Sequence, residues 1–373
     1  MTQTSFPRNR SSPIISVHEA LGANFFVWNQ MLVPKSYGKD IESEHWAIRQ
    51  AAGLTDMSGI KKIWIKGADA SEVINYSITR DCNKIKPGSA AYAALLDDEG
   101  HLVDDAVVFN LSHRECHKFD ADWLICLGAG FGVEYLTKSL HGAEVIAKAD
   151  DDLACLMLQG PNSKRLIHTC ATGAPPTSLP RFGHGLFSIL GCEVMIARTS
   201  YSGEDGFEIF TERQDATYIW RHLISNGASP VGFDAIDIAR VEAGLLFFGK
   251  DMTGLETPTE LELDFIVDES KREFRGKTAW QKKSKNPRHK LCGLSIDGLF
   301  PMREGASLWF NNSPVGKITS CATSTWLGRT VAIARMEPGS VTSKRQVKVF
   351  DDGQCYAEGR AGIICSRRFY SNV

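Results

Sequence analysis

Two acidic side chains of this 373-residue chain stand in strand patterns where a carboxylate could bind a ligand or move a proton. The first, Glu208, lies between Phe207 and Ile209, directly after the turn-forming residues 200–206. Successive side chains of a strand face opposite ways, so Phe207 and Ile209 share one face and Glu208 lies on the other. The simpler interpretation is a glutamate that faces water. The alternative is a carboxylate held beside a turn to bind a ligand.

The second carboxylate, Asp105, belongs to a hairpin pattern. Apolar runs at 90–96 and 102–109 flank a turn that ends in Gly100. A two-residue loop would place Tyr92 opposite Asp105, and a bulge at Gly100 would shift that pairing by one residue.

The alternation of this strand decides which acid can serve a site. Asp104 and Asp105 are neighbours, so they cannot both face the same site. Asp105 shares its face with Val107 and Phe109, which suggests an inward carboxylate suited to acid–base work. The other interpretation is that the two acids end a strand at the surface.

A third stretch, residues 123–136, joins an apolar run to glycines and a helical pattern. Gly128, Gly130 and Gly132 have the spacing GxGxG, not the GxGxxG of a dinucleotide site, and no acidic residue follows at the expected distance. We therefore predict a tight turn from strand to helix and no nicotinamide or flavin site.

Composition excludes several classes of function. A net charge of −2 gives no general attraction to nucleic acid or to an anionic membrane. The ten cysteines contain no CxxC pair, which indicates buried free thiols and no metal site. No apolar stretch at the start predicts a signal peptide, and no run is long enough to span a membrane. We expect a cytoplasmic protein.

The last third of the chain contains a predicted linker and a β-rich region. Residues 282–290 are basic and contain a proline, which predicts a solvated linker. Residues 291–370 consist of short strand patterns with turns at regular spacing, which predicts a small barrel or sandwich. Helical and strand patterns earlier in the chain make the whole an α+β protein.

These pieces stand in an order that resembles the aminomethyltransferase family, whose best-known member is the T-protein of the glycine cleavage system. The resemblance implies a three-lobed, ring-like fold around a funnel that holds tetrahydrofolate. It also implies a discontinuous folate-binding domain (1–58 plus 152–281), an α/β domain that bears the hairpin (59–151) and a C-terminal β-barrel (288–373). The matching motifs are AYAALLDDEGHLVDDAVVF, LQGPNS, RTSYSGEDGFEIF, ARVEAGL, FGKDM, TPTELEL and GKITS.

The resemblance implies a role for each matched residue. Asp105 is expected to be the acid–base residue, with Tyr92 and Tyr201 in contact with the folate. Glu208 is expected to bind the aminopyrimidine edge of the pterin, because a carboxylate can accept two parallel hydrogen bonds from that fork. Phe109 stands at a folate-contacting position where the family usually has a tyrosine.

Several departures from the T-protein bear on the substrate. A histidine-containing motif has Gly59 in place of the histidine, and an asparagine-bearing segment after the hairpin has become residues 128–131, GAGF. The segment VWNQMLVPKSY is instead similar to dimethylsulfoniopropionate demethylase. Its Trp28 and Tyr37 could offer aromatic faces to a cationic methyl donor, or could simply be core aromatics.

The sequence therefore predicts a tetrahydrofolate-dependent demethylase that moves a methyl group from a small methylated compound to N5 of the folate, giving 5-methyl-tetrahydrofolate. The alternatives are a T-protein-type aminomethyltransferase that uses a lipoyl carrier protein and gives methylene-tetrahydrofolate, or a non-catalytic folate-binding protein. Relatives of the last kind have a cysteine in a Lys-Gly-Cys motif, where this chain has Gly249-Lys250-Asp251-Met252. The sequence identifies neither the donor nor the oligomeric state.

Overall fold

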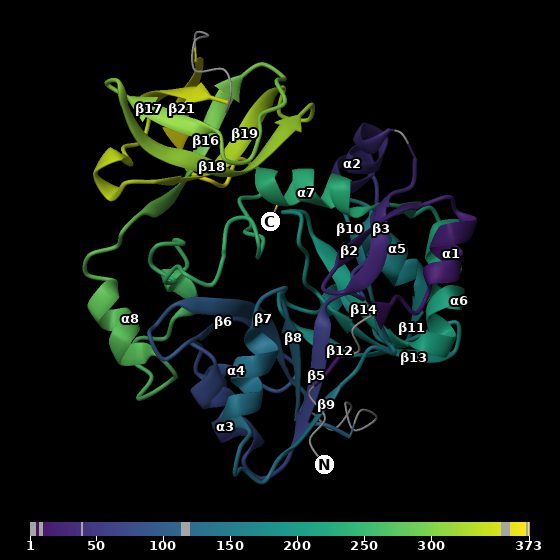
Figure 1. The fold of residues 1–373 in the computed structure, drawn as a ribbon. Helices are drawn as coiled ribbons and strands as arrows, with labels where there is room; N and C mark the ends of the chain where they lie inside the picture. Colours follow the sequence, from purple (N-terminus) through teal and green to yellow (C-terminus); the bar gives the residue numbers. More distant parts are fainter. Residues whose placement is uncertain are drawn as a thin grey trace.

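The computed structural model describes residues 5–6, 10–38, 40–112, 120–351, 359–370 and 372. Its helices and sheets form three parts around a common centre, an α+β arrangement in which the barrel lies at the top of the view and two sheet-bearing parts lie below it (Figure 1). No helix in the described ranges is long and apolar enough to cross a membrane.

The first part is built on a seven-stranded sheet. It alternates apolar residues toward both faces, so each of its central strands is buried throughout. In spatial order its strands are β11 (Ala171–Thr172), β12 (His184–Ile189), β13 (Cys192–Ala197), β14 (Gly206–Glu212), β10 (Leu153–Gln159), β4 (Gly53–Asp56) and β15 (Ser229–Pro230).

Helices α5 (Ser163–Cys170) and α6 (Arg213–Ser225) cover one face of this sheet, where Leu166, Trp220 and the strand residues Phe207 and Ile209 form one core. A three-stranded sheet from the N-terminal segment adjoins the same part. Its members are β1 (Arg10–Ser11), β3 (Met31–Ser36) and β2 (Asn24–Trp28), with α1 (Ile15–Ala20) and α2 (Ile41–Gln50) beside them.

The second part is a five-stranded sheet whose outer face is covered by α3 (Ala70–Ser77) and α4 (Gly132–Ser139) (Figure 1). Its strands are β6 (Ala90–Leu96), β7 (Leu102–Asn110), β8 (Trp123–Leu127), β5 (Lys61–Lys66) and β9 (Ile146–Ala149). Strand β8 pairs antiparallel with both β5 and β7, so the strand-to-helix turn at 128–131 belongs to no parallel βαβ unit. The predicted tight turn from strand to helix is confirmed, between β8 and α4.

The third part is a closed barrel, as the strand patterns after residue 290 predicted. Its strands are β16 (Lys290–Asp297), β19 (Arg329–Met336), β18 (Ser313–Ser324), β17 (Ser307–Phe310), β20 (Gln346–Phe350) and β21 (Arg360–Cys365). Helix α7 (Phe233–Glu242) lies between the barrel and the first part, and α8 (Lys277–Lys283) lies beside the second (Figure 1). Short 3-10 turns complete the chain at η1 (Cys82–Lys84), η3 (Pro176–Ser178), η4 (Asp264–Ile266) and η5 (Pro338–Ser340).

One apolar core lies between the two large sheets. From the five-stranded sheet it takes Phe109 and Cys126, and from the seven-stranded sheet Cys155, Met157 and Phe210. These residues alternate with those that face the covering helices, so each sheet buries both of its faces. Groups on the inner faces of β7 and β14 therefore meet in the space between the two sheets.

The hairpin of β6 and β7 forms as predicted, but the predicted register was wrong. Tyr92 pairs with Val107, and Asp105 pairs with Ala94. The loop after Asp97 has three residues, ending in Gly100 at φ +80°, and a further irregularity follows in the ladder. Each adds one residue to the β7 side, and together they shift the pairing by two.

The eight cysteines among the described residues are all free thiols, as predicted, and five of them are buried. Cys116 and Cys355 lie outside the described residues.

Candidate functional site

Asp105 and Tyr92 face the same side of the hairpin and contact each other. The Tyr92 hydroxyl donates to Asp105 Oδ2 at 2.8 Å. The second oxygen, Oδ1, accepts from no side chain in the described part of the chain and lies close to the backbone of Gly128, where a Cβ would be only 2.5 Å from it. One oxygen of the half-buried carboxylate is thus fixed, and the other can accept a proton.

Burial raises the pKa of Asp105 above that of an ordinary aspartate. The hydrogen bond from Tyr92 opposes this shift, because it stabilises the charged carboxylate. A carboxylate with a raised pKa is a better proton acceptor at neutral pH than one exposed to water.

Asp104 points to the opposite face of β7, as the alternation predicted, and its contacts there are to backbone groups of a loop. It is fully buried and accepts the backbone N–H groups of Gly130 (3.1 Å) and Gly132 (3.0 Å). Its carboxylate therefore fixes the loop between β8 and α4 against strand β7. Sequence reasoning had assigned no role to it.

Tyr201 lies in the same neighbourhood. Its hydroxyl donates to the carbonyl of Leu246, in the segment after α7. Burial raises the pKa of Tyr201, and the nearby charge of Asp105 raises it further. Tyr201 also packs against the inter-sheet core that contains Phe109.

Glu208 lies on the inner face of β14, with Phe207 and Ile209 on the other face, as the alternation predicted. It is only 9% exposed, so the interpretation that it faces water is wrong. Thr199 donates its hydroxyl to Glu208 Oε2. No described residue donates to Oε1, and burial raises the pKa of the carboxyl. The structure thus holds a buried carboxylate that can still accept hydrogen bonds.

Phe109 packs between β7 and β14, the two strands that bear these carboxylates. Its ring is fully buried and contacts Phe210 with 5.5 Å between centroids. Asp105 lies four residues from Phe109 on the same face of β7, about 13 Å along the strand, and Glu208 lies two residues, about 7 Å, from Phe210 on β14. Asp105 and Glu208 both lie on inner faces of their sheets and face the space between them, called the gap below.

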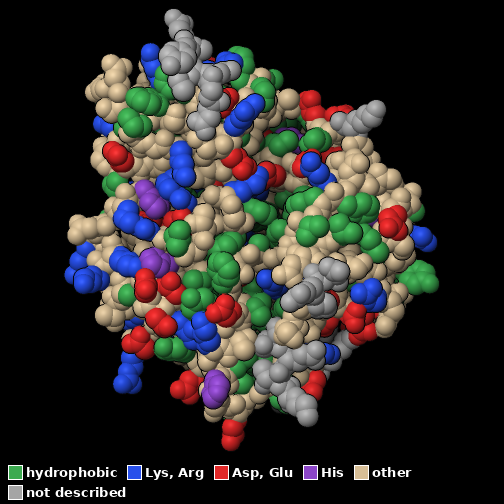
Figure 2. Space-filling view, in the orientation of Figure 1, with side chains coloured by type: hydrophobic (Ala, Val, Ile, Leu, Met, Phe, Trp, Pro, Cys, Tyr) green, Lys and Arg blue, Asp and Glu red, His purple; other side chains and the backbone are tan. Residues whose placement is uncertain are grey.

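One face of the molecule is hollowed at its centre (Figure 2). Figure 2 shows hydrophobic side chains gathered in the recessed centre of this face, between the barrel and the two sheet-bearing parts. Half-buried residues packed against the inter-sheet core include Val107, Ala129, Tyr201 and Phe247. A flat apolar ring system with a polar edge would suit such a surface.

The two aromatic residues assigned to the substrate are not brought together. Trp28 is 8% exposed and belongs to the inter-sheet core, where its ring lies 4.9 Å from that of Phe233. Tyr37 packs against the core on the opposite face of the seven-stranded sheet, and its hydroxyl bonds to His18 Nδ1 at 2.7 Å. Their substrate contacts stay predictions.

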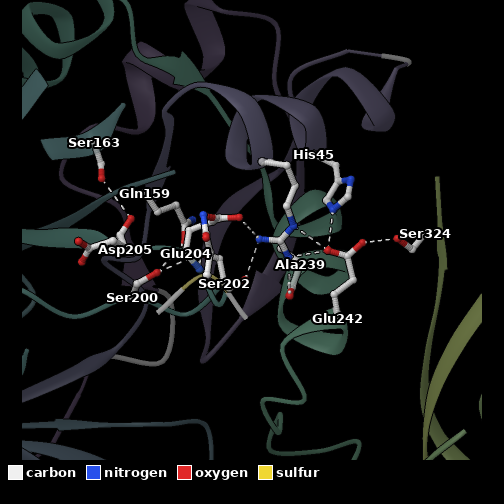
Figure 3. Close-up of polar contacts among 12 residues, drawn as sticks. His45, Gln159, Ser163, Ser200, Ser202, Glu204, Asp205, Ala239, Glu242 and Ser324 are labelled. Carbon is white, nitrogen blue, oxygen red and sulfur yellow. Dashed lines mark hydrogen bonds and ion pairs between the residues drawn. The ribbon is translucent and has the colours of Figure 1, made fainter. Parts of the chain in front are cut away.

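Glu242, at the end of α7, is a buried carboxylate that joins elements far apart in the chain. His45 (3.0 Å) and Arg49 (2.8 Å) bond to one of its oxygens, and Ser324 of the barrel donates to the other (Figure 3). His45 and Arg49 stand four residues apart on one face of α2, a polar pair that could have signalled a shared partner. The partner itself, nearly two hundred residues away, could not have been identified.

Comparison with known proteins accounts for this arrangement. Residues 14–271 match the GCVT N-terminal domain, and residues 289–370 match the glycine cleavage T-protein C-terminal barrel domain. The chain belongs to the glycine cleavage T-protein, or aminomethyltransferase, family. The resemblance drawn from the motif order is confirmed, and so is the fold class. As a member of this family, the chain is a one-carbon transferase.

Individual relatives align over most of their length. The crystal structure of glycine cleavage system aminomethyltransferase T from Bartonella henselae superposes with a TM-score of 0.86 over 97% of this chain and 98% of that one, at 27% identity. An aminomethyltransferase from Alcanivorax borkumensis is 32% identical, covering 90% of this chain and 91% of its own. The heme-dependent oxidative N-demethylase gamma subunit of Ectopseudomonas mendocina is 36% identical, covering 88% and 89%.

Proposed function

We propose that the chain transfers a one-carbon group from a small methylated compound to N5 of tetrahydrofolate, giving 5-methyl-tetrahydrofolate. The observation that supports this best is the pair of inward carboxylates, Asp105 and Glu208, which face the gap between the two sheets. Family membership supports the folate, because aminomethyltransferases use tetrahydrofolate. The free buried thiols support a cytoplasmic location.

The residues present fit a pterin. Glu208 is buried, and Oε1 has no donor within the described part of the chain, so it can accept from a ligand. An aminopyrimidine edge offers parallel N–H groups that match a carboxylate. In this assignment Tyr92, Tyr201 and Phe109 form the walls of the gap and exclude water from it.

When bound, tetrahydrofolate supplies the nitrogen that accepts the one-carbon group. The protein contributes position and charge. Glu208 fixes the ring by its edge, and Asp105 stabilises positive charge that develops nearby. Because Tyr92 occupies Oδ2, Asp105 takes up the released proton at Oδ1. The raised pKa of Asp105 favours this uptake.

The donor would be a methylated cation. Asp105 offers it a negative charge, and aromatic side chains near the gap offer electron-rich faces. We keep Trp28 and Tyr37 as the proposed donor-side aromatic residues, of which Trp28 lies in the inter-sheet core and Tyr37 on the far face of the seven-stranded sheet.

A second candidate is favoured by one of the relatives. That protein is named as a subunit of an oxidative N-demethylase. In such an assembly the one-carbon group would reach the folate at the oxidation level of formaldehyde and leave as methylene-tetrahydrofolate. A lipoyl carrier protein as partner, the T-protein reaction, would give the same folate product.

Incubation of the purified protein with tetrahydrofolate and a panel of ¹³C-methylated donors tests the proposal. We expect labelled 5-methyl-tetrahydrofolate from at least one donor without any carrier protein. Formation of only methylene-tetrahydrofolate, whether from formaldehyde or from an aminomethylated lipoyl carrier, would replace the first candidate by the second or by the T-protein reaction. Omitting the folate should abolish transfer in every case.

A further inference from the structure

The indole of Trp28 has a hydrogen-bond donor with nothing to bind. The side chain is 8% exposed, and its Nε1 meets no acceptor anywhere in the described part of the chain. A buried N–H without an acceptor destabilises the folded state unless a ligand supplies one. Trp64, an equally buried indole of the same core, differs in donating to Asp150 at 2.8 Å.

Glycine at position 59 decides where this indole can lie. A Cβ on Gly59 would come within 2.6 Å of Trp28 Cε3, so the benzene edge of the indole occupies the space that any side chain would fill. Nε1 lies on the opposite edge and points away from Gly59. Arg10 holds this arrangement, because its guanidinium donates to the carbonyls of both Gly59 and Asn29 at 2.8 Å.

The turn that follows Trp28 also contacts the loop between β8 and α4, next to strand β7. Asn29, the residue after Trp28, donates to the carbonyl of Gly128 at 2.7 Å, and the backbone of Gly128 lies close to Asp105 Oδ1. On the other side, the ring of Trp28 lies 6.3 Å from that of Phe247, which follows the carbonyl that Tyr201 binds. Trp28 therefore lies in the inter-sheet core against which Tyr201 packs, and its neighbour Asn29 contacts the loop beside Asp105.

We propose that Trp28 Nε1 is a specificity-determining donor of the methyl-donor subsite, and that it binds a hydrogen-bond acceptor carried by the donor itself. The donor class is then a small methylated ammonium compound with a carboxylate. The ammonium faces Asp105 and the rings of Trp28 and Phe247, while the carboxylate accepts from Nε1. This inference rests on the proposed function and narrows its donor.

Calorimetric titration of the full chain without folate tests the subsite, using N,N-dimethylglycine and trimethylamine as probes. They share a methylated nitrogen, and only the first has a carboxylate. We expect the wild-type protein to prefer N,N-dimethylglycine. Trp28→Phe should weaken the binding of N,N-dimethylglycine about tenfold, because the N–H is lost, and should leave the affinity for trimethylamine nearly unchanged, because phenylalanine keeps an aromatic face for the ammonium. Trp64→Phe is the matched control and should change neither.

The inference is overturned if Trp28→Phe weakens the binding of both probes equally or of neither. It is also overturned if the wild-type protein does not bind N,N-dimethylglycine. A second variant guards against a general packing effect. Gly59→Ala should displace the indole and weaken the binding of N,N-dimethylglycine, while the affinity for 5-methyl-tetrahydrofolate stays as in the wild type. Gly339→Ala, whose Cβ would meet open space, should change neither affinity. If transfer from other donors proceeds while these predictions fail, the inference falls and the proposed function stands.

Discussion

At the scale of single residues, the adjacent aspartates Asp104 and Asp105 differ in what their carboxylates contact. Asp104 is surrounded by backbone N–H groups and fixes a loop, whereas Asp105 has one hydroxyl partner and one oxygen that accepts from no side chain in the described part of the chain. Both lie in one strand, so alternation alone separates them. The sequence could predict this difference in direction, because it depends only on the period of two.

Tyr92→Phe should move the pH dependence of turnover. The hydrogen bond from Tyr92 stabilises the ionised form of Asp105 and so lowers a pKa that burial has raised. Without it the pKa rises further, and the ionised base is lost at a higher pH. We expect the acidic limb of the pH profile of kcat to shift upward, with the alkaline side unchanged. An unshifted limb would mean that Asp105 is not the group that titrates.

The register of Tyr92 against Asp105 could not be predicted in the same way. It depends on one residue in the loop and one in an irregular ladder position, and neither leaves a mark in hydrophobic periodicity. Likewise, the burial of Glu208 depends on a second sheet packing over it, which no local pattern shows. Motif order suggested its role; its surroundings came only from tertiary structure.

At the scale of elements, the loop between β8 and α4 is shaped to approach strand β7. Gly128, Gly130 and Gly132 each come so close to Asp104 or Asp105 that a Cβ would lie under 3 Å from a carboxylate atom or backbone. The glycines that suggested a nucleotide fingerprint instead permit this contact. Their spacing was visible in the sequence, but the strand they contact was not.

Gly128→Ala should therefore impair catalysis more than stability. The new Cβ would lie 2.5 Å from Asp105 Oδ1 and 2.9 Å from Asp104 Oδ1, so the carboxylate that we propose as the acid–base group must move. Because displacement of a reacting group by about 1 Å can cost on the order of 100-fold in rate, we expect kcat to fall at least tenfold. Gly339→Ala, whose Cβ meets nothing within 4 Å, should keep full activity. A wild-type kcat in Gly128→Ala would contradict the proposal that Asp105 Oδ1 accepts the proton.

At the scale of the whole molecule, the three parts are held around the site by buried polar contacts. Glu242 at the end of α7 joins Arg49 of the first part to Ser324 of the barrel, and Arg49 reaches Glu204 at 2.9 Å as well. These partners lie far apart in the chain. The sequence could therefore predict the three sets of elements and the barrel, but not the contacts that fix their relative positions.

Glu242→Gln should destabilise the fold markedly, because it leaves Arg49 buried with half of its charge partners. Breaking a buried ion pair in this way costs about 3–5 kcal/mol. The neighbours lower the pKa of Glu242, so its contribution is complete above the ordinary pKa of glutamate and is lost as the pH falls below it. Urea unfolding at pH 7 measures the loss.

The control for that experiment is Glu134→Gln on α4. Glu134 pairs with Lys138 at 2.8 Å, but both side chains are exposed, so the pair contributes little to stability and Glu134→Gln should leave urea unfolding nearly unchanged. Equal destabilisation by the two substitutions would show that Glu242 does not join the parts.

The measurement that tests the account most directly is the dissociation constant of tetrahydrofolate for the wild-type protein, Glu208→Gln and Asp105→Asn, with turnover measured in parallel. Glu208→Gln should weaken binding at least tenfold, because a charged acceptor is lost from a buried site. Asp105→Asn should bind as the wild type does and turn over about 100-fold or more slowly. Wild-type affinity in Glu208→Gln, or unchanged turnover in Asp105→Asn, would contradict the division of binding and chemistry between the two carboxylates.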